Sequence, residues 1–455
     1  MEMILEFLRD VLSQPALLIG IMSCVGLIAL KRPFHKIMTG TLKPILGYLM
    51  LAAGAGVIVS NLDPLGKMIE HGFHITGVVP NNEAIVAVAQ KVLGVETMSI
   101  LVVGLLMNLL IARFTKFKYV FLTGHHSLFM ACLMSAVLGT AGLSGIELIL
   151  VGGFLMGAWS AISPAIGQSY TSKVTDGDEI ALGHFGSLGY YLSAWVAKYV
   201  GKAEDSTEDI EIPEKWGFLR DSTLSTALTM IVFYLIAALA AGSEFVATLS
   251  GSMSPYLFAV MSAMNFAVGV AIVYSGVRMI LGDLIPAFQG IATKIIPNAI
   301  PAVDCAVFFT YAPTAVVLGF ISSFIGGIIG MLVLGAVGGV LIIPGLVPHF
   351  FCGATAGIYG NATGGRRGAA VGAFLNGLAI TFLPALALPV LGQLGFQNTT
   401  FGDADFAVIG LVLGNAFEWI GMAGIYGIVA IAFLVLIIPN FIKTKGKVIN
   451  YVEED

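Results

Sequence analysis

Residues 315–343 read AVVLGFISSFIGGIIGMLVLGAVGGVLII and contain no charged side chain. About 20 mostly apolar residues are enough for a helix to cross the hydrocarbon core of a bilayer, so this stretch can span a membrane. The chain of 455 residues has the same character throughout, because 57% of it is hydrophobic and 11% is charged, with a mean hydropathy of +0.94. Soluble domains carry roughly 25% charged residues. The composition therefore predicts a polytopic integral membrane protein.

Nine further apolar stretches are candidate spans: 15–30, 44–62, 99–112, 119–138, 148–166, 224–242, 256–277, 369–391 and 406–441. The region 298–313 is shorter and is broken by prolines. The first stretch is interpreted as a retained span, because the N-terminal MEMILEFLRD is acidic and no small-residue cleavage site follows Leu30. These segments predict an all-α fold of about eleven transmembrane helices, some of them broken or re-entrant.

The basic residues predict the orientation of these spans. Lys and Arg in short loops stay on the cytoplasmic side, and alternating the spans places all 22 of them there except Arg9, Lys67 and Lys91. We therefore expect an external N-terminus, a cytoplasmic C-terminus and an odd number of crossings. Eleven crossings fit if the chain crosses twice between Lys294 and Arg366, while nine or thirteen remain possible.

Several classes of function have no support in the sequence. Cys24, Cys132, Cys305 and Cys352 are scattered without zinc or redox spacing, so no disulfide framework and no metal site is expected. The nucleotide-binding pattern GxxxxGK[ST] is absent, which argues against ATP-driven transport by this chain alone. We expect no cofactor, no catalytic residue and no nucleic-acid partner.

The charged segment VGKAEDSTEDIEIPEKWGFLRD, residues 200–221, separates two halves of the chain. It is too charged to enter a bilayer, so it is expected in the cytoplasm. An acidic surface of this kind can dock another protein, but a solvated linker is the favoured interpretation.

The two halves carry a weak internal duplication. RFTKFKYVFLTGHHSLFMACL (113–133) and IATKIIPNAIPAVDCAVFFTY (291–311) each contain Thr-Lys, followed nine or ten positions after the lysine by His125 or Asp304. Transporters built from structural repeats bind their substrate near the midplane, on helices interrupted by Gly or Pro. The sequence therefore predicts two structural repeats whose interruptions surround a substrate site.

Polar residues in these apolar contexts are the candidate site. His125, His184 and Asp304 are predicted to face the substrate, since ionisable groups inside a membrane are costly and usually functional. Pro297 and Pro301 near Asp304 leave backbone carbonyls that need partners. Adjacent helix positions differ by about 100°, so His126 is expected to face protein rather than the cavity.

The runs LTGHH, KVTDG, LGH, GVRM, IPAVDCA, YAPTAVVLGF, LIIPG and FFCGATAG occur in this order across nearly the whole chain. Together they resemble the membrane component IIC of the bacterial phosphotransferase system (PTS) for L-ascorbate. The resemblance implies a homodimer in the bacterial cytoplasmic (inner) membrane that moves its substrate inward by an elevator motion. It also implies a phosphorylated IIB partner, charged by IIA, that carries the phosphoryl group on its own cysteine.

The same resemblance implies a single unit, 1–455, made of two parts. A V-shaped scaffold is expected over about 1–65 and 222–290, and a substrate-binding core over about 97–200 and 291–392. A last transmembrane helix is expected over 406–441.

The resemblance implies a sugar site of which this sequence keeps only some residues. His125, His184 and Asp304 match polar positions of its pattern, but the glutamines that follow both histidines are replaced by Phe129 (with Met130 after it) and by Phe185. Ala55 stands where a small polar residue is expected between two glycines. A site without these amide groups should bind a substrate with a different arrangement of hydroxyl groups. Ascorbate thus remains the default substrate, with another sugar acid, a pentose or an alditol as alternatives.

A proton-coupled secondary transporter of a sugar acid is the rival hypothesis, with Asp304 and the histidines as a proton relay. It would share the topology and the intramembrane carboxylate, but it would deliver unmodified solute. A membrane enzyme is less favoured, because no nucleophile with a base is evident.

Overall fold

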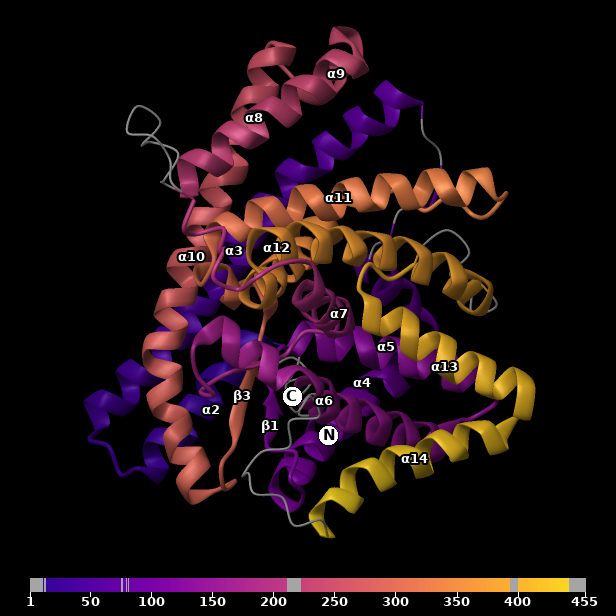
Figure 1. The fold of residues 1–455 in the computed structure, drawn as a ribbon. Helices are drawn as coiled ribbons and strands as arrows, with labels where there is room; N and C mark the ends of the chain where they lie inside the picture. The colour runs from indigo at the N-terminus through magenta and orange to yellow at the C-terminus, as the bar shows by residue number, and fades with distance from the viewer. Residues whose placement is uncertain are drawn as a thin grey trace.

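The computed structural model describes residues 14–74, 82–210, 222–392 and 400–441, together with positions 11, 77, 78 and 80. Its described elements, shown in Figure 1, are helices α2 (Pro15–Ala29), α3 (Phe34–Phe73), α4 (Asn82–Phe114), α5 (Gly124–Thr140), α6 (Gly145–Thr175), α7 (Ser187–Val200), α8 (Ser222–Ala241), α9 (Ser243–Ser250), α10 (Pro255–Lys294), α11 (Pro313–Ala336), α12 (Leu346–Gly392), α13 (Ala404–Ile420) and α14 (Met422–Phe441), with strands β1 (Tyr119–Phe121), β2 (Ala181–Leu182) and β3 (Ile300–Val303) and the 3₁₀ helix η2 (Cys305–Thr310).

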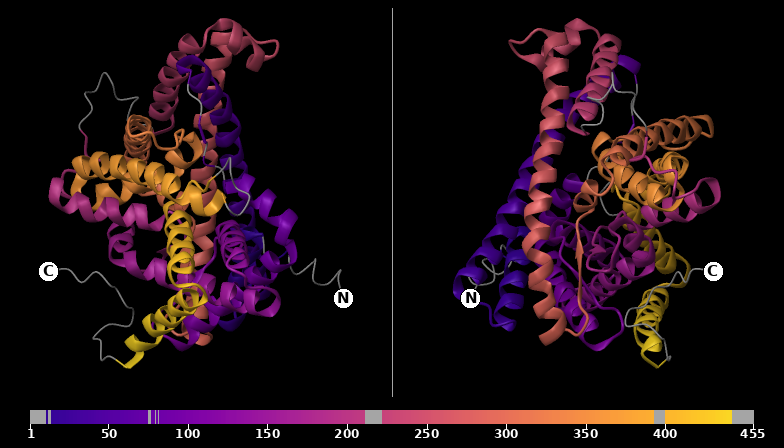
Figure 2. Two further views of the ribbon diagram at one scale, coloured as in Figure 1. Left: turned by 90° about the vertical axis from the view of Figure 1, so that its right-hand side faces the viewer. Right: turned by 60° about the vertical axis from the view of Figure 1, so that its left-hand side comes forward.

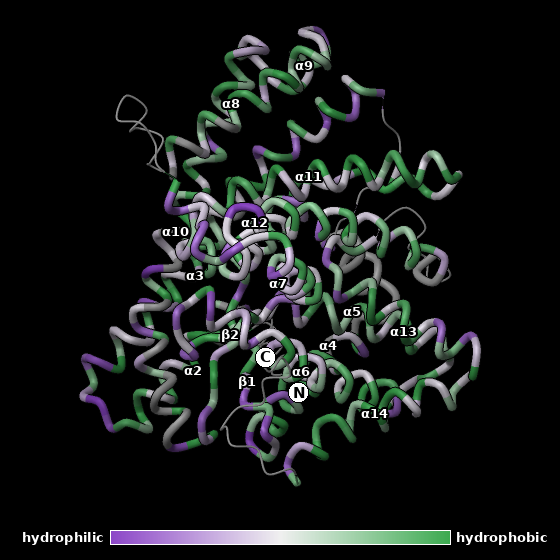
Figure 3. Tube along the Cα trace, in the orientation of Figure 1, coloured by the Kyte–Doolittle hydropathy of each residue, from purple (hydrophilic) through white to green (hydrophobic). Residues whose placement is uncertain are grey.

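Seven helices in the described ranges are long and apolar enough to cross a membrane, and the bent pair α8–α9 adds an eighth if it counts as one span. Hydrophobic residues cover most of the length of α11 and α14 in Figure 3. The prediction of an all-α polytopic membrane protein is therefore confirmed, while the count of eleven crossings stays a prediction.

Backbone breaks explain why the helices and the predicted spans do not correspond one to one. The segment predicted as one last helix, 406–441, is divided into α13 and α14 at Gly421, whose φ is 67°. A positive φ suits glycine and ends a helix. Helix α12 is likewise two helices, because Gly364 and Gly365 have non-helical backbone angles. The stretch 119–138 begins as strand β1 and continues as the 17-residue, largely buried helix α5.

Helices α2, α3, α8 and α10 pack against one another, and α3 and α10 are each 40 residues long. The long helix α10 and the crossing α3 are prominent in the right-hand view of Figure 2. Glycines permit their close approach, since a Cβ on Gly47 would lie 2.8 Å from the carbonyl oxygen of Gly276, and one on Gly54 would lie 2.7 Å from that of Gly269. Small residues at such contacts are typical of membrane helices, whose backbones pack closely.

Helices α4–α7 and α11–α14 form a second group, in which α12 packs against α7, α11 and α13, and α6 packs against α4, α5 and α14, whereas α9 packs against the first group. The two arms of α12 fold onto each other, because a Cβ on Gly360 would meet the carbonyl oxygen of Gly368 at 2.4 Å. This second group surrounds a small parallel sheet with the strand order β1-β3-β2.

The sheet unites the two sequence halves that carry the weak duplication. Tyr119 pairs with Ile300 in the β1–β3 register, and Ala181 pairs with Ala302 in the β2–β3 register. Proline in a central strand usually removes a ladder hydrogen bond. Ile300 N donates to Lys118 O on the β1 side, so the nitrogen of Pro301 faces the other side, where β2 begins only opposite Ala302. The proline therefore costs no bond in the ladder.

The described part of the charged connector, residues 200–210, is exposed along most of its length but is anchored to the second group by a few hydrogen bonds. The Glu208 carboxylate accepts from the backbone N–H groups of Thr314 and Ala315 at the start of α11, over 3.1–3.2 Å. Thr207 N donates to the Asn361 side chain over 2.8 Å. These contacts anchor the connector, while its acidic side chains Asp205 and Glu208 stay exposed to solvent. The interpretation as a solvated linker stays a prediction, and residues 211–221 lie outside the described ranges.

Candidate functional site

The carboxyl ends of the three parallel strands gather the three residues that the sequence singled out. His125 lies in the first turn of α5 after β1, His184 lies two residues after β2, and Asp304 directly follows β3. The strands are held in step beyond the ladder by Leu122 N donating to Ala302 O and by Gly183 N donating to Val303 O. Open parallel sheets commonly place ligands outside these ends. The sheet therefore brings polar residues from both halves of the chain to one place.

Asp304 both caps a helix and faces His125. Its Oδ1 accepts from Ala306 N over 3.1 Å, which caps η2, and its Oδ2 lies 3.4 Å from Nε2 of His125. Nδ1 of His125 lies 3.2 Å from the Tyr48 hydroxyl on α3. If Nε2–H donates to the carboxylate, Nδ1 is left to accept from the tyrosine. The contact joins the second group of helices to α3.

His184 is held by its own turn. The Gly186 N–H donates to Nδ1 over 3.1 Å, and the Tyr190 hydroxyl lies 3.0 Å from the same nitrogen. A nitrogen that accepts from a backbone N–H carries no proton, so the neutral imidazole carries its proton on Nε2. The ring therefore offers Nε2–H as a donor.

These residues line a cavity of about 780 Å³ that extends along α3. Its inner part is lined by Tyr48, the histidines, the carboxylates and two cysteines, one wall is formed by residues 343–348, and Asp63, Lys67 and Glu70 lie towards the other end of α3. Tyr48 and Asp63 are separated by roughly 22 Å at 1.5 Å per helical residue. Such a volume is typical of small-molecule sites.

The remaining predicted site residues divide between the cavity and the packing behind it. Phe129 lines the cavity with its ring against both His125 and His126. His126, which was expected to face protein, is 3% exposed yet also borders the cavity. Phe185 is fully buried and stacks on Phe121 at 4.6 Å, behind the lining. Ala55 lies on α3, and its side chain is outside the part that the structure describes.

Comparison with known proteins places this architecture in a family. The family model for the sugar-specific permease component of the PTS, EIIC-GAT, matches residues 10–405. The chain belongs to this permease family. Its sequence is also similar to the ascorbate-specific PTS system EIIC component of Mycoplasma pneumoniae (strain ATCC 29342 / M129 / Subtype 1), with 27% identity over 417 residues. The match covers 78% of this chain and 62% of the relative, so the chain spans less than two thirds of that relative's length.

Several lining residues of this permease escaped the sequence analysis. Asp403, Cys352 and Tyr48 all border the cavity. Asp403 lies in the turn FGDAD (401–405), just before the last apolar run. Two carboxylates at the edge of an apolar segment were a usable signal, but a helix start also favours acidic residues. The sequence alone could not separate these two roles.

The structure separates the roles of Asp403 and Asp405. The Asp405 carboxylate accepts from Ser187 Oγ over 2.7 Å, from Leu188 N over 2.9 Å and from Trp159 Nε1 over 3.2 Å. Its own N–H donates to Phe185 O over 3.0 Å. Asp405 is fully buried and thus caps α7, which fixes the turn that carries His184.

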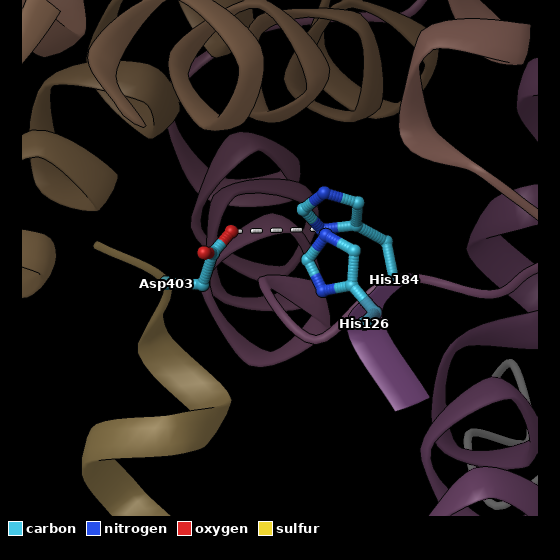
Figure 4. Close-up of side chains that lie close together, drawn as sticks. All are labelled: His126, His184 and Asp403. Carbon is cyan, nitrogen blue, oxygen red and sulfur yellow. Dashed lines mark ion pairs between the residues drawn. The ribbon is translucent and has the colours of Figure 1, made fainter. Parts of the chain in front are cut away.

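Asp403 instead joins the cavity wall. Its Oδ2 accepts from Asn82 Nδ2 over 2.6 Å and its Oδ1 from Cys352 Sγ over 3.0 Å. Oδ1 also lies 3.8 Å from Nδ1 of His184, the contact drawn in Figure 4, where the rings of His126 and His184 overlap beside the carboxylate.

The donor sets His126–His184–Asp403 and His184–Asp304–Cys305 each have ligand atoms within 4.8 Å of one another, a spacing that a metal ion could use. A metal ligand must offer a free lone pair. The His184 nitrogen nearest Asp403 already accepts from Gly186 N–H, and Cys352 donates to the carboxylate. In the His126–His184–Asp403 set these atoms are therefore already engaged in hydrogen bonds.

Proposed function

We propose that this chain is the membrane permease subunit of a bacterial PTS that takes up ascorbate or a related sugar acid, pentose or alditol. The observation that carries the proposal is the convergence of His125, His184 and Asp304, from three strands and both halves of the chain, on one cavity of sugar-binding size. Membership of the permease family supports the same conclusion.

We propose the inner membrane as its location and an elevator as its motion. In this proposal the scaffold covers about 1–65 and 222–290, and the core covers about 97–200 and 291–392. The mutual packing of α2, α3, α8 and α10 supports a scaffold, and the position of the cavity between α3 and the strand ends supports a moving core. A homodimer would hold the scaffold still while the core moves.

The proposed orientation makes this conformation outward-facing. Lys31, Arg32 and Lys36 lie at the start of α3, and a cytoplasmic position for them puts Asp63 and Glu70 on the external side. The cavity reaches those residues, so it would receive solute from outside. The Nε2–H of His184 and the carboxylate of Asp304 would bind its hydroxyls.

Phosphorylation is assigned to a separate IIB protein. Phosphoryl transfer needs an accessible carrier with charge stabilisation. Cys132, Cys305 and Cys352 are at most 2% exposed, and the partly exposed Cys24 lies in the uncharged helix α2, which offers no charge to stabilise phosphate. Cys305 and Cys352 lie beside carboxylates, which disfavour a thiolate and repel phosphate. This chain would supply selectivity and alternating exposure.

Proteoliposomes that enclose phosphorylated IIB test the proposal. Solute offered outside should appear inside as its phosphate ester, and vesicles with unphosphorylated IIB should accumulate none. The control separates transport from leakage. Accumulation of unmodified solute driven by a pH gradient would contradict the proposal and support the proton-coupled alternative.

A further inference from the structure

Two carboxylates lie close to His184. Asp304 and Cys305 have ligand atoms within 4.8 Å of that imidazole, and Asp403 with His126 forms the other cluster around it. Asp304 comes from the end of β3, and Asp403 comes from the turn before α13. Both line the cavity and both are less than 10% exposed. The solute that meets His184 therefore meets two acidic groups.

Each carboxylate keeps acceptor capacity for a ligand. A carboxylate offers about four lone-pair sites. Asp403 uses one for Asn82 and one for Cys352, while Asp304 uses one for Ala306 N and faces His125 with the other oxygen. The remaining sites suit the donor hydrogens of hydroxyl groups.

Positive charge is scarce along the same cavity. Among the described residues that line it, four are carboxylates, Asp63, Glu70, Asp304 and Asp403, and one is a cationic side chain, Lys67. The Lys67 ammonium is exposed and pairs with Asp63 over 2.8 Å. An anion bound at His184 would thus be close to two carboxylates with no lysine or arginine beside it, and like charges in a buried site repel strongly.

A hydroxyl group can both accept from and donate to the side chains around His184. The Nε2–H of His184 donates to a hydroxyl oxygen, and the hydroxyl hydrogen then donates to Asp304 or Asp403. Phe129 adds an aromatic face that packs on C–H groups of a sugar chain. From this arrangement, and resting on the proposed function, we infer that the permease selects neutral polyhydroxylated solutes, pentitols and hexitols or the matching sugars, over anionic ones such as ascorbate. Asp403 is the specificity-determining residue.

The first test uses wild-type protein, so it does not depend on a variant that folds. Purified permease is titrated calorimetrically with pentitols and hexitols, with the aldonates of equal carbon number, and with L-ascorbate. An alditol should bind about tenfold or more tightly than its aldonate and than ascorbate, since one lost charged hydrogen bond alone amounts to such a factor. The inference is overturned if the tightest ligand is an anion, or if no neutral polyol binds.

Asp403→Asn then tests the assignment to one residue. The amide keeps the size and one acceptor oxygen but removes the charge. We expect polyol affinity to fall about tenfold and the ratio of ascorbate to polyol affinity to rise about tenfold or more. Asp209→Asn is the matched control, because it removes the same charge from an exposed residue that does not line the cavity, and it should change neither affinity by more than about twofold. Equal effects of both variants on the ratio, or none from Asp403→Asn, would assign the selectivity elsewhere.

The outcomes distinguish this inference from the proposed function. If an anion binds best and is still phosphorylated by IIB in vesicles, the permease function stands and the selectivity inference fails. If a polyol binds best but is delivered unmodified, the selectivity stands and the phosphotransferase role fails.

Discussion

Two turns supply the carboxylates of the cavity, and they divide their tasks differently. After β3, the single residue Asp304 both caps η2 and faces His125. In the first turn of α13, Asp405 caps α7. Asp403, two residues earlier, lines the cavity and also accepts from Asn82 and Cys352. Solute binding and stability are therefore coupled in one residue after β3, whereas at the start of α13 more of the stabilising contacts belong to Asp405 than to Asp403.

The largest expected effect comes from breaking the coupled turn. Asp304→Ala removes the acceptor for Ala306 N, a cap worth about 0.5–2 kcal/mol of unfolding free energy, together with a solute contact worth about 1.5–3 kcal/mol of binding free energy. Asp304→Asn keeps a capping oxygen, so it should lose the binding term and retain most of the stability. Thermal unfolding and calorimetric titration measure the two quantities separately. Unchanged affinity in Asp304→Asn would reduce this residue to a helix cap.

Asp405→Asn changes the second of these turns, and it should lower the free energy of unfolding with little effect on solute binding. The amide nitrogen would face Ser187 or Trp159, which donate to the carboxylate, and a buried donor left without an acceptor costs about 1–3 kcal/mol of unfolding free energy. Adding Trp159→Phe removes one stranded donor and should recover part of this loss. Asp403→Asn should cost less, about 1 kcal/mol, because Asp403 accepts two hydrogen bonds where Asp405 accepts three, and because it borders the cavity. Equal unfolding temperatures for Asp403→Asn and Asp405→Asn would show that the two tasks are not divided.

The sequence predicted what local patterns encode. Apolar stretches identified a polytopic helical protein, and isolated polar residues in those stretches identified His125, His184 and Asp304, which the structure brings to one cavity. The strands could not be foreseen, because two to four residues give too short a pattern and because their pairing joins residues about 120 to 180 positions apart. The breaks at Gly365 and Gly421 were hidden for a similar reason, since 56 glycines occur and only their φ values distinguish these positions.

The smallest expected effect concerns Phe129 and Phe185, which stand where the ascorbate pattern has glutamines. Phe129 lines the cavity, whereas Phe185 stacks on Phe121 and contacts Phe406 behind it. Phe129→Gln would thus present an amide beside His125, and its donor hydrogens should strengthen ascorbate binding by about 0.5–1.5 kcal/mol without reversing the selectivity that Asp403 imposes. Phe185→Gln is the matched comparison, because it places the same amide among aromatic rings, where it should lower the unfolding temperature and leave ascorbate affinity unchanged. Calorimetric titration of both variants with ascorbate decides between these positions. A higher affinity in Phe185→Gln and an unchanged one in Phe129→Gln would mean that the solute contacts the aromatic layer behind His126 rather than the cavity lining.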